Sequence, residues 1–188
     1  MIILFNCGLI YGIDVSEEAN DNKEISGELT KESEEPNNVE DFRIAGIQIY
    51  FSGDNVKKLY GEPIKKKTIV QPSPFYSDVD LYFTTWYYSD FEVCFVIANK
   101  RKNPKPKDIG KVYSIKLTTN KFKTVRGIGI GDSVSLLNQK YGSDLDEYKI
   151  DDKNYLRYWK SIRIILFKVS KEIVTEIEVH EAVFELGE

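Results

Sequence analysis

The chain has 188 residues, of which 26 are Lys or Arg and 30 are Asp or Glu, and 41% of it is hydrophobic. This length suits one domain or two small ones, and it is enough to bury a core without disulfide or metal support. No apolar stretch reaches the ~20 residues of a membrane-spanning helix, and one histidine with two cysteines supplies few metal ligands. We therefore predict no resident metal and no cofactor.

Residues 1–13 are uncharged and almost wholly apolar. They are similar to the apolar part of a secretory signal, with Gly12 at a suitable cleavage point, although the basic residues that open such a signal are missing. A buried N-terminal strand is the alternative. Cys7 follows Leu4 at the spacing of a bacterial lipidation motif, which makes it a candidate lipidation site. Otherwise it is one more apolar residue of the signal.

Residues 14–41 contain eleven acidic and two basic residues, a net charge of −9. Because the whole chain carries −4, the remaining residues carry +5. A segment so acidic and so poor in large apolar residues buries too little surface to offset the entropy of ordering it. We predict a disordered acidic tether over 14–41 and a folded domain that starts near Phe42.

The folded part contains an internal repeat, in which three blocks recur in the same order. The aligned pairs are 46–61 with 127–142, 87–95 with 158–166, and 112–117 with 174–179. We interpret this as a tandem duplication, with repeat unit 1 over 42–123 and repeat unit 2 over 124–188, and we expect both units in one compact domain.

Each predicted unit begins with a short helix. Asp132 or Ser133 is a suitable N-cap, and Gly142 supplies the left-handed residue that ends a helix, as Gly61 does in unit 1. Segments that alternate with period two follow, and a break in the alternation over 112–117 indicates a bulge. The prediction is an α+β fold of two tandem units, each a short helical segment packed on an antiparallel β-sheet.

The motif Gly-Ile-Gly-Ile-Gly-Asp-Ser over 127–133, with seven residues between it and Tyr141-Gly142, resembles the bacterial envelope superfamily that contains β-lactamase inhibitor protein and the SmpA/OmlA (BamE)-like small lipoproteins. The resemblance implies helical segments on antiparallel sheets, in tandem in the inhibitor, and proteins as partners. It implies no contact residue. Unit 1 departs from the motif at Tyr50 and Phe51, so we expect a distorted helix start there.

An aromatic stretch over 81–88 gives the best candidate site. On a strand, Leu81, Phe83, Thr85 and Tyr87 would share the core face, and the alternate residues would line an open face. Trp, Tyr and Arg are the residues that most often anchor interfaces. The predicted binding residues are Tyr82, Trp86, Tyr88, Tyr155, Arg157 and Trp159. The alternative is that a helix or the other unit covers this face and makes it core.

Four other features have simpler interpretations. The glycines of 127–131 fit neither phosphate-loop pattern and indicate a turn. The basic clusters at 65–67 and 100–107 are interpreted as solvated loops, with an anionic surface or the acidic tether as alternative contacts. Cys94 lies in a strand-like run and is interpreted as a small hydrophobe. His180 is the only histidine, and no catalytic triad is recognisable, so we predict no enzyme and no catalytic residue.

Together these features predict a non-catalytic, exported bacterial envelope protein, in the periplasm or associated with the outer membrane or cell surface. It would bind a protein partner through the aromatic sheet face and would touch the membrane only by its N-terminal tether. The alternative is an envelope protein that binds a small ligand or lipid in a cleft between the two units. No nucleic acid is expected, and the sequence leaves the oligomeric state open.

Overall fold

The computed structural model describes residues 39–150 and 153–181. A short 3-10 helix, η1 (Val39–Phe42), precedes the helix α1 (Gly53–Tyr60). A second helix, α2 (Val134–Tyr141), runs directly into the 3-10 turn η2 (Gly142–Asp144). Four strands follow each α-helix. The strands are β1 (Lys65–Pro72), β2 (Val79–Tyr87), β3 (Phe91–Lys100), β4 (Lys111–Leu117), β5 (Leu145–Ile150), β6 (Lys153–Lys160), β7 (Arg163–Ser170) and β8 (Ile173–Glu181).

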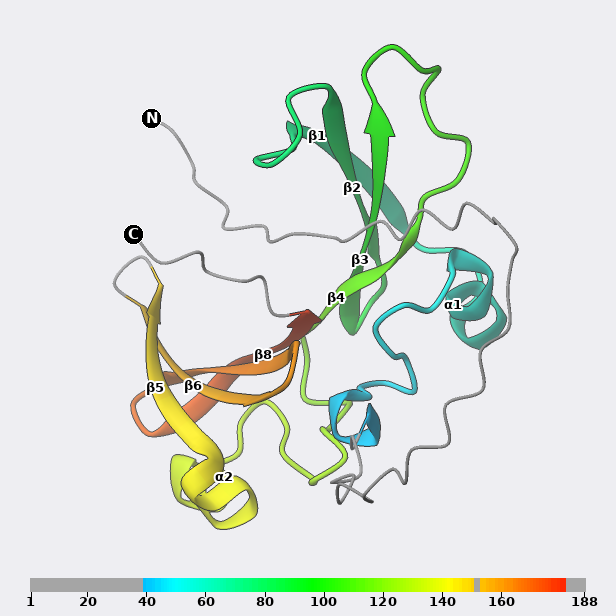
Figure 1. Cartoon of the computed structure of the whole chain (residues 1–188). Coiled ribbons are helices and arrows are strands. Elements are labelled where there is room, and N and C mark those ends of the chain that lie inside the picture. Colours follow the sequence, from blue (N-terminus) through cyan, green and yellow to red (C-terminus); the bar gives the residue numbers. More distant parts are fainter. Residues whose placement is uncertain (1–38, 151–152, 182–188) are drawn as a thin grey trace, which may run out of the picture.

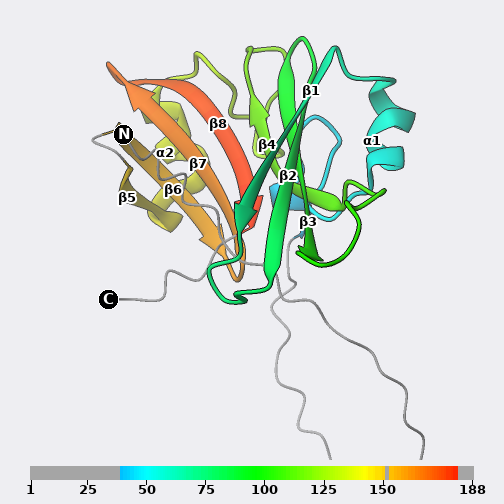
Figure 2. The ribbon, with the colours of Figure 1, turned by 90° about the horizontal axis from the view of Figure 1, so that it is seen from above.

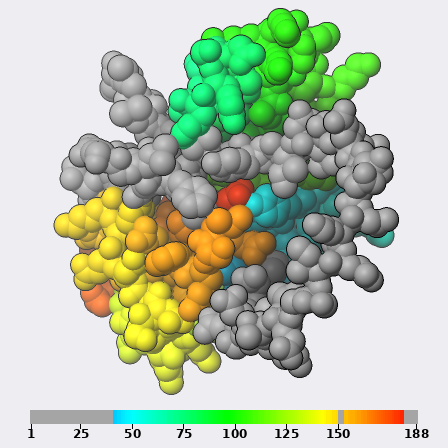
Figure 3. Space-filling view, in the orientation of Figure 1, coloured from blue at the N-terminus to red at the C-terminus, as the bar shows by residue number. Residues whose placement is uncertain are grey.

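All eight strands belong to one antiparallel sheet in the order β1-β2-β3-β4-β8-β7-β6-β5 (Figure 1). The last strand of each half pairs at the centre, where Ile115 lies opposite Val179. The sheet therefore ends at β1 on one side and at β5 on the other. In the space-filling view the green end that contains β1 to β3 lies at the top and the yellow end that contains β5 at the lower left (Figure 3).

The predicted α+β class, with a helix packed on a separate sheet in each of two tandem units, is wrong. Over residues 39–150 and 153–181 the structure has a single eight-stranded sheet that dominates the fold, and the two α-helices there have eight residues each. The physical reason lies at the β4–β8 pair. Two separate sheets would leave the main-chain groups of both strands unpaired, and pairing them removes two open edges at once.

The predicted helix boundaries are confirmed. Ser52 and Ser133 cap the two helices, each accepting a hydrogen bond from the main-chain N–H three residues on. Gly61 and Gly142 end them with φ of 73° and 59°. At the first helix Asn55 Oδ1 accepts from Ser52 N at 3.0 Å, which completes a capping box. The distortion expected at this helix start lies outside the helix, at Tyr50 with φ of 72°.

Both helices lie on the same side of the sheet (Figure 2), and we call this side the covered face. Val56 of α1 and Leu137 and Tyr141 of α2 belong to one large core with the sheet residues of this face. The opposite face has a much smaller apolar cluster, formed by Leu81, Phe83, Val96 and Tyr113 with Cys94 packed against it. The break predicted in β4 is present as a register shift opposite Cys94 and Phe95.

The folded domain begins before Phe42, because the side chain of Asp41 is buried and hydrogen-bonded to residues of the domain. This side chain is 8% exposed and accepts hydrogen bonds from Arg126 Nη2 at 2.7 Å and Tyr158 Oη at 2.9 Å. Burial alone would raise the pKa of Asp41, but the hydrogen bonds and charge of Arg126 and the bond from Tyr158 outweigh it, so the pKa lies below its usual value. The end of the predicted tether is thus part of the fold.

The predicted signal-like segment 1–13, the candidate lipidation site Cys7 and residues 14–38 of the predicted tether lie outside the described residues. Within the described ranges, no helix is long and apolar enough to cross a membrane.

Candidate ligand-binding pocket

Trp86, the centre of the predicted binding face, is buried. It lies opposite Val93 on the covered face, its side chain is 3% exposed, and its ring packs on Phe95 with 4.6 Å between centroids. Tyr82 and Thr84 share this face with it because strand residues alternate. The expectation that Leu81 and Phe83 face the main core and Trp86 an open surface is therefore wrong. Elements of the first half cover Trp86.

Tyr155, Arg157 and Trp159 do not join Trp86, because they point to the opposite face. Tyr158 pairs with Ile165 and lies in the main core, so its neighbours along β6 point away from that core. The alignment of 87–95 with 158–166 pairs Tyr158 with Tyr87. Tyr158 points to the covered face, whereas Tyr87 points to the other face of the sheet. A shift of one residue reverses the side of every side chain in a strand. The predicted single site is therefore two separate groups.

Tyr88 has a structural position at the end of the first helix. Its ring stacks on Phe91 with 4.8 Å between centroids, and its hydroxyl donates to the carbonyl oxygen of Gly61 at 3.1 Å. Burial, with a smaller contribution from Glu62, raises its pKa to about 12. We assign Tyr88 to the packing of α1 on the sheet.

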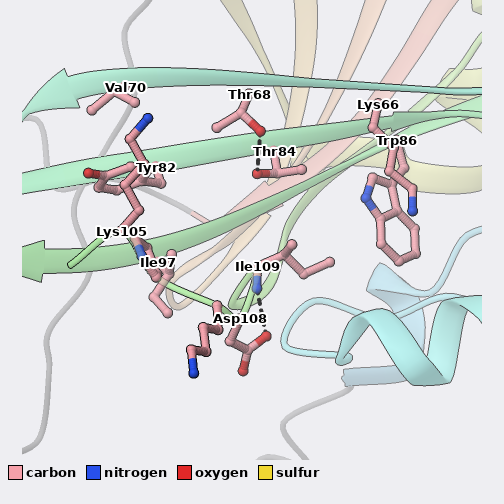
Figure 4. A pocket seen from close by; sticks show the side chains of 12 residues that line it. Lys66, Thr68, Val70, Tyr82, Thr84, Trp86, Ile97, Lys105, Asp108 and Ile109 are labelled. Atoms are coloured by element: carbon pink, nitrogen blue, oxygen red, sulfur yellow. Dashed lines mark hydrogen bonds between the residues drawn. The ribbon is translucent and has the colours of Figure 1, made fainter.

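The covered face carries a pocket of about 530 Å³, within the usual range for ligand sites. Its floor is the covered face of β1, β2 and β3, and its outer wall is the loop that joins β3 to β4 (Figure 4). All of its lining residues come from the first half of the chain, so it is not the predicted cleft between two units. The lining residues are Lys66, Thr68, Val70, Tyr82, Thr84, Trp86, Ile97, Lys105, Pro106, Lys107, Asp108 and Ile109.

The outer loop is held in place by specific contacts. The Asp108 carboxylate accepts from the main-chain N–H groups of Ile109 at 2.6 Å and Gly110 at 3.2 Å. Gly110 has φ of 82°, and a Cβ there would overlap the carbonyl oxygen of Val96 in β3. Asn99 Nδ2 donates to Pro104 O at 2.9 Å, which ties the start of the loop to the end of β3. The pocket therefore has a preformed outer wall.

The indole N–H of Trp86 is the most informative group in the pocket. Nε1 is fully buried and has no hydrogen-bond partner among the described residues. The six-membered ring lies against Gly53 and Ile109, where a Cβ on Gly53 would come within 3.0 Å of Cη2. The nitrogen edge of the ring lies on the side of the pocket (Figure 4). A buried donor without an acceptor costs about 1–3 kcal/mol, which a ligand acceptor would recover if it displaced the side chains that cover the nitrogen.

Two lysine ammonium groups lie over the ring of Trp86, and two further lysines line the pocket. The Lys66 ammonium lies 4.9 Å from the centre of the Trp86 ring, and the Lys57 ammonium lies at 5.5 Å on a neighbouring helix turn. Both also contact Glu62, at 3.0 Å and 2.7 Å, and their hydrogen bonds hold the pKa of Glu62 below its usual value. Lys105 and Lys107, on the opposite wall, have no ion pair with any described carboxylate.

This arrangement favours an anion that also has an apolar part. Val70, Ile97 and Ile109 supply apolar walls, while the hydroxyls of Thr68 and Thr84, 3.0 Å apart, supply a polar strip along the floor. Among the described residues, no group of three His, Cys, Asp or Glu side chains could hold a metal ion. The sequence identified Tyr82 and Trp86, but it missed the lysines because 65–67 were interpreted as a loop rather than β1.

The remaining sequence candidates have structural positions. The glycine-rich turn is closed by Asp132, whose carboxylate accepts from Gly129 N at 2.8 Å and contacts Lys123 Nζ at 3.0 Å. His180 Nδ1 lies 2.8 Å from the carbonyl oxygen of its neighbour Glu181. On the opposite face, Arg157 binds Asp146 at 2.6 Å and stacks over Tyr148, and Trp159 is 52% exposed.

No protein-family model and no curated protein matches the sequence. Among solved structures, it is similar to an extracellular protein with an SCP domain from Bacillus anthracis, at 14% identity and a TM-score of 0.43, over 89% of this chain and 50% of that one. It is also similar to a cysteine-rich secretory protein from Staphylococcus aureus, at 10% identity and 0.42, over 71% and 44%. A third is a DUF4309 family protein from Bacillus subtilis, at 14% identity and 0.38, over 69% and 78%.

The chain spans about half the length of the first two of these proteins. The first is described as an extracellular protein and the second as a secretory protein. None of the three is a β-lactamase inhibitor protein or a BamE-like lipoprotein, so that resemblance stays a prediction.

Proposed function

We propose that this chain is a non-catalytic binding protein that takes a carboxylate-bearing ligand in the pocket between β1–β3 and the loop 101–110. The observation that carries the proposal is the buried, unpartnered indole N–H of Trp86, with Lys105 and Lys107 on the facing wall. A carboxylate that displaced the side chains covering this nitrogen would satisfy the donor with a charge-assisted hydrogen bond. The apolar walls would accept the carbon chain of the ligand.

Calorimetric titration with glutarate, a five-carbon dicarboxylate, tests this proposal. Glutaramide has the same size without charge and is the matched ligand control. We expect glutarate to bind and glutaramide to bind at least about tenfold more weakly, the usual worth of a hydrogen bond to a charged group. Trp86→Phe should weaken glutarate by a similar factor while the fold is kept. Trp159→Phe, on the opposite face, is the matched protein control and should bind normally.

Equal affinity of the wild-type chain and Trp86→Phe would contradict the proposal. The double variant Lys105→Gln/Lys107→Gln separates the charge from the indole donor. It should also weaken glutarate, and it should reduce the loss of affinity that added salt causes, because two cations that attract the ligand are gone.

We further propose that this binding protein belongs to the bacterial cell envelope, in line with the resemblance of its motif to the β-lactamase inhibitor and BamE-like superfamily. Intact-mass analysis of the protein recovered from its cells distinguishes the two forms. A mass with acyl chains on Cys7 indicates a membrane-tethered lipoprotein. Cleavage near Gly12 without lipid indicates a free exported protein, and an unprocessed N-terminus would contradict export.

A second candidate, binding of a protein partner through aromatic side chains, is favoured by Trp159. This residue is 52% exposed and lies on the same face of β6 as Arg157, which stacks over Tyr148. This surface consists of Tyr155, Arg157 and Trp159, without the buried Trp86. Retention of a partner from envelope extracts by the wild-type chain and its loss with Trp159→Ala would support it. Equal retention by both chains would argue against it.

A further inference from the structure

The strand β1, which forms one side of the pocket, is also an open edge of the sheet. It is the first strand in the sheet order, with no described residue paired to its outer side, and seven of its eight residues are exposed. Ile69 and Val70 are 39% and 48% exposed. An exposed strand edge presents main-chain donors and acceptors to any extended chain that lies beside it.

The direction of these main-chain groups follows from the register. Ser73 N donates to Val79 O at 2.9 Å, which continues the β1–β2 register as a hydrogen-bonded pair. Hydrogen-bonded and non-bonded pairs alternate along an antiparallel ladder. The main-chain groups of Lys66, Thr68 and Val70 therefore face away from β2, toward the open edge. The side chains of the same three residues line the pocket.

We propose that the ligand is an extended acidic segment of another polypeptide, which adds to β1 as a ninth, antiparallel strand and directs its carboxylates to the pocket side. This inference rests on the proposed function and names its ligand class. In an antiparallel pair, residues that exchange main-chain hydrogen bonds have their side chains on the same face. Acidic residues that bond to Lys66, Thr68 and Val70 would thus point toward the pocket.

The positive charge of β1 and of the facing loop favours an acidic strand as the ligand. β1 carries Lys65, Lys66 and Lys67, and Lys105 and Lys107 lie across the pocket. Lysines on an edge strand disfavour pairing with neutral or basic strands, because pairing would bring like charges together or bury a charge. The same lysines attract an acidic strand. An edge that excludes other copies of itself therefore still admits a peptide with alternating carboxylates.

The test uses the full chain and a seven-residue peptide, Thr-Glu-Val-Glu-Val-Glu-Thr, acetylated and amidated at its ends. Two analogues are N-methylated, one at the Glu amides and one at the Val amides. The Glu amides would face β1 and the Val amides would face solvent. We expect methylation of the Glu amides to weaken binding at least about tenfold, and methylation of the Val amides to change it less than about threefold.

A protein variant tests the same contact from the other side. Val70→Pro removes an outward N–H at an edge strand, where proline is tolerated. Val70→Ala is the matched control, because it makes the same pocket wall smaller but keeps the N–H. Val70→Pro should weaken the peptide several-fold more than Val70→Ala does, and circular dichroism checks that both variants fold. The two methylated peptides test the inference on the wild-type chain even if Val70→Pro does not fold.

The outcomes separate this inference from the proposed function. If glutarate and the peptide bind but both methylated analogues bind equally, the strand addition is wrong and the carboxylate pocket stands. If neither glutarate nor the peptide binds, both are wrong. Binding of a Lys-for-Glu version of the peptide with equal affinity would also overturn the inference, because it would remove the role of charge.

Discussion

At the scale of single residues, one buried group distinguishes a ligand site from ordinary core. Trp86 has the burial and ring contacts of a core residue, yet the part of the chain that the structure describes gives its N–H no partner, which buried donors nearly always have. The sequence pattern indicated Trp86 as a binding residue for an incorrect reason, namely its expected exposure. It predicted an exposed anchor, whereas the structure places the indole beneath a loop. Burial by a loop far along the chain depends on tertiary contacts that periodicity does not record.

Gly110 shapes the outer wall of the pocket, and its replacement should be costly. Gly110→Ala combines a positive φ with a clash against Val96, so we expect unfolding to become easier by about 3 kcal/mol or more. Glutarate affinity should fall as the loop moves. Gly46→Ala is the matched control, because Gly46 has φ of 70° but open space around it, and should cost about 1 kcal/mol. Equal losses in a denaturant titration would show that the close approach is unimportant.

At the scale of elements, local signals predicted what local contacts determine. The helix α2 begins after Ser133 and ends before Gly142, as predicted from the capping preferences of serine and glycine. The predicted break in β4 is present as a bulge. The faces of the strands were predicted less well. The alignment paired Tyr158 with Tyr87, which is wrong by one residue in terms of strand faces. It therefore predicted that Trp86 and Trp159 share one face, whereas they lie on opposite faces of the sheet. The sequence pattern of a strand shows which residues share a face. Tertiary packing decides which of the two faces the helices and loops cover.

The two helix caps give a prediction at this scale. Ser52→Ala and Ser133→Ala each remove an acceptor for a helix N–H, and each should lower the free energy of unfolding by about 1 kcal/mol. Ser52→Ala should cost more than Ser133→Ala, because it also breaks the capping box with Asn55. Ser135→Ala, at an exposed position inside α2, is the control and should be neutral or slightly stabilising. Thermal denaturation measures all three.

At the scale of the whole molecule, the pairing of β4 with β8 joins the two halves into one sheet. The sequence predicted two units with separate sheets, because a repeated pattern is visible in a sequence and an edge-to-edge pairing is not. The same fold keeps the proposed binding activity at one end. The pocket and the basic edge β1 both belong to the first half, and the exposed Trp159 lies on the opposite face of the second.

Because one sheet runs through both halves, we predict that the domain unfolds in a single transition. Its free energy of unfolding should depend on pH through Tyr141, a residue of the second half. Burial raises the pKa of Tyr141 to about 12. A raised pKa means that its stabilising contribution is complete below about pH 10 and is lost as pH rises toward 12. We expect the free energy of unfolding to fall over that window by about 2 kcal/mol from this group. Tyr141→Phe should flatten the fall, and two separate transitions would contradict a single cooperative sheet.

The most direct test of the binding site uses the indole N–H signals of the two tryptophans, which are the only two in the chain. In a two-dimensional ¹⁵N–¹H spectrum they give two indole peaks, which Trp159→Phe assigns. On titration with glutarate, we predict that the Trp86 peak moves to lower field as its proton gains an acceptor, while the Trp159 peak stays in place. A Trp86 peak that does not move under saturating glutarate, or a shift of the Trp159 peak alone, would contradict the carboxylate pocket.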